Sequence, residues 1–124
     1  MADGSPGEPV VADLADMEVS PTAALLEGAE LSPHVDTSIF VTRTPPGKSV
    51  ELHVRTYAET FILLAGRGRW TCGERVVELE PNGVVVVPPD TPHGFRNIGE
   101  EPLLVVSTHE RGRIEQSWLG RDPA

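Results

Sequence analysis

The sequence predicts an all-β domain, either a sandwich or an antiparallel jelly roll. The chain has 124 residues, with twelve glycines and twelve prolines, and short runs of Val, Ile and Leu lie between these turn-forming residues. From Thr37 onward, strand patterns recur about every eight to twelve residues, which is typical of small sandwiches and barrels. A chain of this length is expected to fold as one domain around one core.

The N-terminal segment, residues 1–19, is expected to be acidic and flexible. It combines Asp, Glu, Gly and Pro with few large apolar side chains, a composition typical of segments that do not build a core. The folded domain is expected to span residues 20–124 and to begin with a short helical or irregular segment. Ser20 as N-cap, Pro21 at the first helical position and Gly28 at the end predict one or two helical turns there.

Eight strands are expected in the rest of the domain. Their limits follow from runs of β-branched and aromatic residues that are bounded by turn residues. The links "TPPGK", "CGER" and "PPDTPH" are turns by composition. The expected strands are residues 37–42, 49–57, 59–65, 68–72, 75–79, 83–87, 94–97 and 103–109.

Composition argues against several partners and locations. The net charge is −9, and the chain therefore lacks the basic excess that nucleic-acid binding requires. It has no long apolar run of the kind that crosses a membrane. The N-terminus has no basic region followed by an apolar one, as a secretory signal would have. Because Cys72 is the one cysteine, no internal disulfide can form, and a cytoplasmic location is expected.

The first group of candidate site residues lies in residues 47–66, "GKSVELHVRTYAETFILLAG". Residues two apart in a strand point to the same face, so His53, Arg55 and Tyr57 face the same space. Histidine and glutamate, here His53 and Glu59, are common metal ligands. Arg55 cannot be a ligand, because its guanidinium stays protonated and has no lone pair to offer.

The second group lies in residues 81–97, "PNGVVVVPPDTPHGFRN". Four valines favour a buried strand, and "PPDTP" favours a turn. His93 then begins a strand in which Phe95 and Asn97 share its face. Taken together, the two stretches resemble the two motifs of the cupin superfamily, whose members are small jelly-roll barrels with a metal site inside.

The first cupin motif matches at four positions. It reads glycine, five residues, His-x-His, three or four residues, glutamate, six residues, glycine. Gly47, His53, Glu59 and Gly66 stand at the right spacings, and Arg55 replaces the second histidine.

The second motif matches at three positions and departs from the pattern at two turns. Pro88, His93 and Asn97 match, whereas Asn82 replaces the first glycine and Asp90 replaces the glycine after the proline. Asn and Asp tolerate the backbone of a glycine turn better than most residues.

The resemblance implies a divalent transition metal held by His53, Glu59 and His93. Two histidines and one carboxylate with open positions suit Fe(II) and also hold Zn, Ni, Mn or Co. Two readings of Arg55 stay open. It either pairs with Glu59 in a metal-free pocket or binds an anionic group of a substrate.

The resemblance also implies a small metal-dependent enzyme of the dioxygenase or the isomerase/cyclase type, acting on a small organic substrate inside the barrel. Arg55, Tyr57 and His93 are the candidate catalytic residues. The alternatives are a metal-free ligand-binding cupin and a metal-free acid–base catalyst in which Arg55 holds an anion, and the fold alone does not choose between them. The expected partners are a small-molecule ligand and a second copy in a homodimer, with no nucleic acid and no membrane.

Four further residues lie outside both motifs. His34 and His109 are expected at the surface or at strand ends, with His109 able to reach the mouth of the barrel. Trp70 and Trp118 are the largest apolar side chains, and each is expected to serve in packing or in a dimer face.

Overall fold

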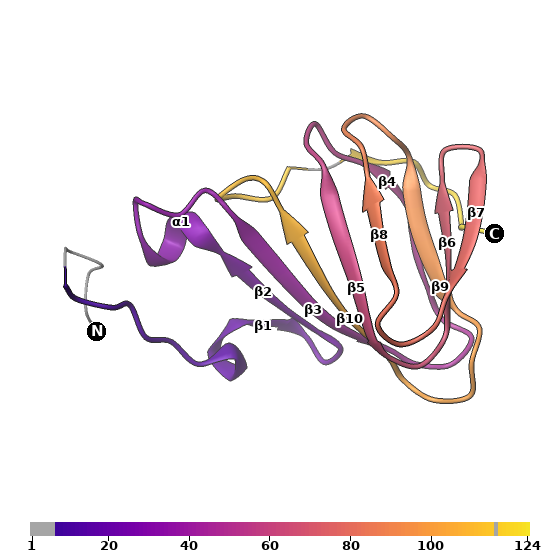
Figure 1. Cartoon of the computed structure of the whole chain (residues 1–124), viewed down its shortest axis with the longest axis horizontal. Helices are drawn as coiled ribbons and strands as arrows, with labels where there is room; N and C mark the ends of the chain where they lie inside the picture. The colour runs from indigo at the N-terminus through magenta and orange to yellow at the C-terminus, as the bar shows by residue number, and fades with distance from the viewer. Residues whose placement is uncertain (1–6, 116) are drawn as a thin grey trace.

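The structure, a computed structural model, describes residues 7–115 and 117–124 and consists mainly of two antiparallel sheets (Figure 1). The six-stranded sheet has the order β1-β2-β3-β10-β5-β8, and the five-stranded sheet has the order β11-β4-β9-β6-β7. This architecture confirms the predicted jelly roll. The elements are η1 (Leu14–Met17), β1 (Glu18–Ser20), β2 (Ala23–Glu27), α1 (Gly28–Leu31), β3 (Ser38–Thr44), β4 (Ser49–Val54), β5 (Glu59–Ala65), β6 (Gly68–Cys72), β7 (Arg75–Leu79), β8 (Val84–Val87), β9 (His93–Asn97), β10 (Leu103–His109) and β11 (Ser117–Trp118).

All eight predicted strands are present, and the limits of β5, β6, β7 and β10 are those expected. The largest difference is at β4, which ends at Val54 instead of Tyr57. Just beyond this end, the carbonyl of Arg55 accepts a hydrogen bond from the backbone N–H of Asp90 at 2.8 Å. This bond ties the end of β4 to the turn that precedes β9.

The helix predicted after Ser20 is wrong. Ala23–Glu27 forms β2, which pairs with β3 over five residues, and β1 and β2 make a hairpin that extends the six-stranded sheet (Figure 1). The Ser20 hydroxyl accepts from the N–H of Thr22 and so stabilises the hairpin turn instead of capping a helix. Pairing with the edge of β3 outweighs the helix propensity of "AALLE", since propensity is a weak prior.

The division into an N-terminal segment of residues 1–19 and a domain of residues 20–124 stays a prediction. Within that segment the structure places η1 and β1, and residues 1–6 lie outside the described residues. The two helices of the described residues have four residues each. Neither is long and apolar enough to cross a membrane.

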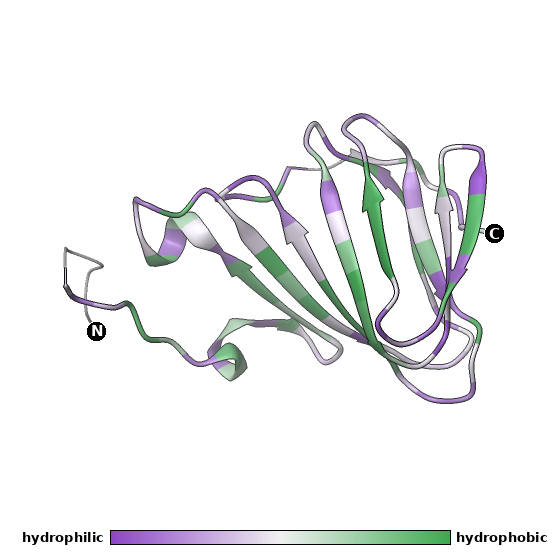
Figure 2. Cartoon of the chain, in the orientation of Figure 1, coloured by the Kyte–Doolittle hydropathy of each residue, from purple (hydrophilic) through white to green (hydrophobic). Residues whose placement is uncertain are grey.

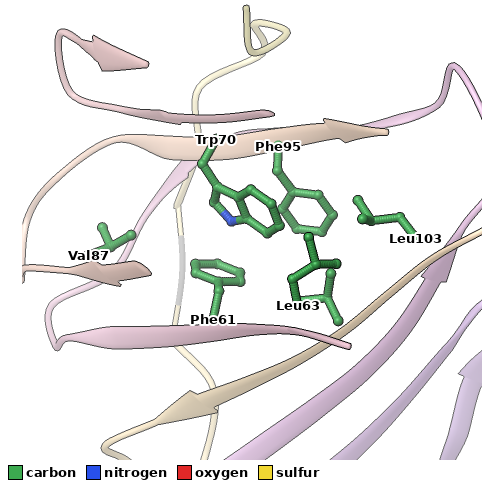
Figure 3. Packing of buried hydrophobic residues seen from close by; sticks show 7 residues of the cluster. Phe61, Leu63, Trp70, Val87, Phe95 and Leu103 are labelled. Atoms are coloured by element: carbon green, nitrogen blue, oxygen red, sulfur yellow. The ribbon is translucent and has the colours of Figure 1, made fainter. Parts of the chain in front are cut away.

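The main core lies between the two sheets (Figure 3). Trp70 is fully buried and stacks on Phe95, with ring centroids 5.0 Å apart, while Phe61 from the other sheet meets both rings edge-on. Such aromatic pairs stabilise the fold by more than the burial of their apolar surface alone. Phe61 also packs edge-on against the ring of His93, so the core directly supports the candidate site.

The two turns that depart from the cupin glycine pattern keep the backbone that glycine would adopt. Asn82 has φ 76° and Asp90 has φ 59°, and they are the positive-φ residues other than glycine in the described part of the chain. Asn and Asp are the side chains that enter this region most readily. The substitutions therefore preserve the turns before β8 and β9.

Candidate metal centre

Two cross-strand pairs bring the polar side chains of the site together. His53 on β4 lies opposite His93 on β9 in the five-stranded sheet. Glu59 on β5 lies opposite His109 on β10 in the six-stranded sheet. All four side chains are buried. Each sheet thus contributes one pair, and three histidines and one glutamate meet between the sheets.

The three predicted ligands, His53, Glu59 and His93, converge as expected. Their candidate ligand atoms all lie within 4.8 Å of one another. Oε1 of Glu59 lies 2.8 Å from Nε2 of His93 and 4.0 Å from Nε2 of His53. Two ligands of one ion, each at roughly 2.0–2.2 Å, are separated by no more than about 4.4 Å. Small shifts would therefore place all three on one ion, and their role as metal ligands stays a prediction.

Both motif histidines are held in a ring orientation that suits metal binding. Nδ1 of His53 lies 2.8 Å from the carbonyl of Glu51, and Nδ1 of His93 lies 2.8 Å from the carbonyl of Thr91. Because a carbonyl only accepts, each Nδ1 carries the hydrogen. A neutral ring then presents the lone pair of Nε2 to the site, which is how a metal-binding histidine is usually fixed.

The contact between His93 and Glu59 is informative for the same reason. A neutral His93 with its hydrogen on Nδ1 has a lone pair on Nε2. This lone pair would face Oε1 of the Glu59 carboxylate at a distance of 2.8 Å. Two lone pairs repel at this distance, so a positive charge is required between them. A proton on the imidazole or a metal ion would satisfy the contact.

Arg55 occupies the same space. Its side chain is buried, and its Nε donates to Oε1 of Glu59 at 2.8 Å. Its Nη1 donates at 3.3 Å to the hydroxyl of Tyr57 and at 3.3 Å to the carbonyl of Glu115. The structure therefore contains the Arg55–Glu59 pair that the sequence left open. Binding of a substrate anion by Arg55 stays a prediction.

The environment keeps Glu59 charged and His53 neutral. Burial by itself raises the pKa of Glu59, but hydrogen bonds from His109 and His93 and the charge of Arg55 outweigh it, so this pKa lies well below its usual range. Burial lowers the pKa of His53 to about 4, and the bond to the Glu51 carbonyl only partly opposes this. The site therefore offers a carboxylate and a neutral imidazole.

His109 ends strand β10, as one of the two expectations had it, but it does not lie at the surface, and that part of the expectation is wrong. Its side chain is fully buried, with Nε2 3.0 Å from Oε2 of Glu59. The sequence held a usable signal, because alternate residues of a strand face one side. Leu103 and Val105 face the core, so Ser107 and His109 must face it too. His34, by contrast, is exposed as expected.

A cavity of about 360 Å³ opens above His53, Arg55 and Glu59. Trp118 pairs with His53 across β11 and β4, and its ring lies 4.9 Å from the imidazole while about half of it is exposed. The other apolar lining residues are Ala23, Phe40, Val50, Phe61, Phe95 and Val105, and the uncharged polar ones are Ser20, Thr42 and Ser107. The cavity is thus mainly apolar, and its charged lining residues are Arg55 and Glu59.

Solved structures similar to this chain include bacterial oxalate decarboxylases. One is a structure of the Bacillus subtilis enzyme described for its Mn(II) centres, with 21% identity and a TM-score of 0.81 over 96% of this chain and 35% of that chain. Another is the formate complex of the Lactobacillus farciminis enzyme, with 19% identity and a TM-score of 0.74 over 85% of this chain and 34% of that chain. The chain thus spans about a third of these proteins, and the likeness shows the fold alone.

Sequence comparison points to the same family. The uncharacterized protein MJ1618 of Methanocaldococcus jannaschii is 33% identical over 73 residues, which are 58% of this chain and 58% of that protein. The family model described as a cupin domain matches residues 40–109. This range holds both motifs, the four polar side chains of the site and most strands of the two sheets, and the chain therefore belongs to the cupin family.

Proposed function

We propose that this protein is a metal-dependent enzyme that holds a divalent transition metal at His53, Glu59 and His93. The observation that carries the proposal is the 2.8 Å contact between Nε2 of His93 and Oε1 of Glu59. Since Nδ1 of His93 is committed to a carbonyl, this contact calls for either a proton on Nε2 or a metal ion, and a metal ion there would also be in reach of His53. Fe, Zn, Ni, Mn and Co all suit this set of donors.

The remaining lining residues favour chemistry at the metal over acid–base rearrangement. A bound ion would polarise a substrate oxygen and, if it were iron, would also support oxidation. Once His53, His93 and Glu59 serve as ligands, the other polar residues that the structure places around the cavity are Arg55 and three hydroxyl groups. None of these is a base near neutral pH. A dioxygenase-like reaction is therefore favoured over isomerisation or cyclisation.

The charge of the site indicates the class of substrate. Arg55 and a divalent ion would bring three positive charges, and Glu59 is the one acidic residue described at the cavity. An anionic head group would reduce the excess charge in this buried space, where charges interact strongly. The apolar walls, including Phe40 and Trp118, would enclose an apolar or aromatic body. The proposed substrate is a small organic anion with such a body, and Arg55 would position its head group.

The Arg55–Glu59 pair also supports a second candidate, a metal-free cupin that binds a small ligand or uses His93 for acid–base catalysis. In that state Arg55 neutralises Glu59, and a proton on His93 satisfies the 2.8 Å contact. A fully hydrogen-bonded ion pair of this kind is stable without a metal.

Elemental analysis of protein prepared without a tag or added metal separates the two candidates. The metal enzyme predicts near-stoichiometric metal that is lost in Glu59→Gln and kept in His34→Ala, which changes an exposed histidine outside the site. Oxygen consumption by the Fe(II)-loaded protein with small aromatic carboxylates then tests the reaction class. Absence of metal even after reconstitution would reject the first candidate.

We also propose a homodimer formed through the outer face of the six-stranded sheet. Strand pairing aligns Ala24, Val41, Val106, Ile62 and Val84 in one row across five strands. Val84 and Val86 on β8 are more than half exposed, and Figure 2 shows β8 as hydrophobic along its length. Such a face suits a second copy, because a two-fold interface must complement itself. The cytoplasmic location inferred from the single cysteine stays a prediction.

A further inference from the structure

His109 belongs to neither cupin motif, yet it is fully buried beside Glu59. Its ring packs edge-on against Phe40 and Tyr57, with both pairs of ring centroids 5.6 Å apart. Nδ1 lies 3.1 Å from the hydroxyl of Tyr57, and Nε2 lies 3.0 Å from Oε2 of Glu59 and 3.2 Å from Oγ of Ser107. The neighbours of each nitrogen indicate which of the two carries the hydrogen.

The hydroxyl of Tyr57 sets the direction of this chain of hydrogen bonds. Its oxygen lies 3.3 Å from Nη1 of Arg55 and 3.4 Å from the backbone N–H of Glu115, and both of these groups are donors. The phenol hydrogen therefore points to Nδ1 of His109, the acceptor that the described residues place beside it. An imidazole that accepts at Nδ1 carries its hydrogen on Nε2.

His109 thus differs from the two motif histidines. His53 and His93 hold hydrogen on Nδ1, which faces a carbonyl, whereas His109 holds it on Nε2, which faces a carboxylate. We propose that His109 is a positioning residue that donates to Oε2 of Glu59 and leaves Oε1 to face the metal. Tyr57 acts through His109 by fixing this tautomer.

The metal part of this inference rests on the proposed function, but the hydrogen-bond chain does not. With hydrogen on Nε2 and Nδ1 committed to Tyr57, His109 has no lone pair for a metal. It would therefore support the ligand Glu59 from outside the coordination sphere. Partners of this kind typically contribute about 10–100-fold to metal affinity.

The first test uses metal-free protein. Long-range ¹H–¹⁵N NMR spectra of ¹⁵N-histidine-labelled chain distinguish the two tautomers. We expect hydrogen on Nε2 of His109 and on Nδ1 of His53, and a weaker preference at His109 in Tyr57→Phe. Hydrogen on Nδ1 of His109 in the unaltered protein would overturn the proposal, whether or not the protein binds a metal.

The second test measures the affinity for Co(II) and the Co(II) absorption spectrum. His109→Gln keeps an N–H near the position of Nε2, whereas His109→Leu removes it. We expect His109→Gln to stay within a few-fold of the unaltered protein and His109→Leu to lose roughly 10–100-fold, with the same ligand-field spectrum in all three. His34→Gln and His34→Leu are the matched controls and should change nothing.

Two results of this second test would overturn the proposal. An altered Co(II) spectrum in both His109 variants would show that His109 is a ligand, and unchanged affinity in His109→Leu would show that it does not position Glu59. If His109→Leu does not fold, Tyr57→Phe breaks the same chain and should weaken Co(II) binding several-fold. If the unaltered protein binds no Co(II), the proposed function fails, and the NMR result still decides the role of His109.

Discussion

Arg55 and His93 contact the same oxygen of Glu59, each with a nitrogen 2.8 Å from Oε1. Their nitrogens thus crowd the one carboxylate atom that also faces His53. A metal at this position would take the place of the proton between His93 and Glu59, and it would lie close to the positive charge of Arg55. Competition between Arg55 and a metal for Glu59 is therefore the main property of the site.

Replacing Arg55 with histidine should favour the metal. Arg55→His removes a positive charge from the site and adds an imidazole on the same strand face, so affinity for Zn(II), Ni(II) or Co(II) should rise roughly tenfold or more. Activity on an anionic substrate should fall, because the positioning charge is lost. Metal titration followed by melting temperature measures the first effect, with Arg75→His, at an exposed arginine that begins β7, as control. Binding no tighter than that of the unaltered protein would refute this account of Arg55.

Removing the charge of Glu59 should destabilise the metal-free protein. Glu59→Gln leaves Arg55 buried without its partner, and breaking a buried pair in this way typically costs about 3–5 kcal/mol of unfolding free energy. The double variant Arg55→Met with Glu59→Gln should recover much of this loss. Urea unfolding measures both, and Glu78→Gln, whose ion pairs are half-exposed, should cost no more than about 1 kcal/mol. Equal losses at Glu59 and Glu78 would contradict the prediction.

The stability of the metal-free protein should fall as the pH drops from neutral. The pKa of His53 is lowered by burial from 6.5 to about 4, so between these values the unfolded chain binds more protons than the folded one. The contribution of a neutral His53 is therefore complete above about pH 6.5 and is lost as the pH falls toward 4. Urea unfolding from pH 7.5 to 4.5 checks this, and the slope should be smaller in His53→Gln. A slope that is unchanged in that variant would show that His53 is not responsible.

A charge on the outer face of β8 should weaken the proposed dimer. Val86→Glu places a carboxylate on a side chain that is 59% exposed in the isolated chain, and in a two-fold interface the charge appears twice. The mass from size-exclusion chromatography with light scattering should fall to that of one chain. Val76→Glu is the control, since Val76 is 50% exposed on β7 of the other sheet. A monomeric unaltered protein, or equal effects of both changes, would reject this interface.

The sequence by itself determined the body of the fold and the three residues that converge on the candidate metal position. The alternation of apolar residues and the turn residues between them predicted every strand from β3 to β10, because both signals are local. The spacing of His53, Glu59 and His93 was informative because it matches the spacing in the two cupin motifs. The same local signals were misleading at Ala23–Glu27, where pairing with β3 decided the structure.

Only the tertiary structure decided what surrounds Glu59. His109 is fifty residues away along the chain and reaches the site because β10 pairs with β5 in the register that sets it opposite Glu59. Likewise, Arg55 was expected to face the same space as His53, but whether it meets Glu59 depends on the bend after β4. Strand register and side-chain direction depend on contacts across both sheets, and no short stretch of sequence contains those contacts.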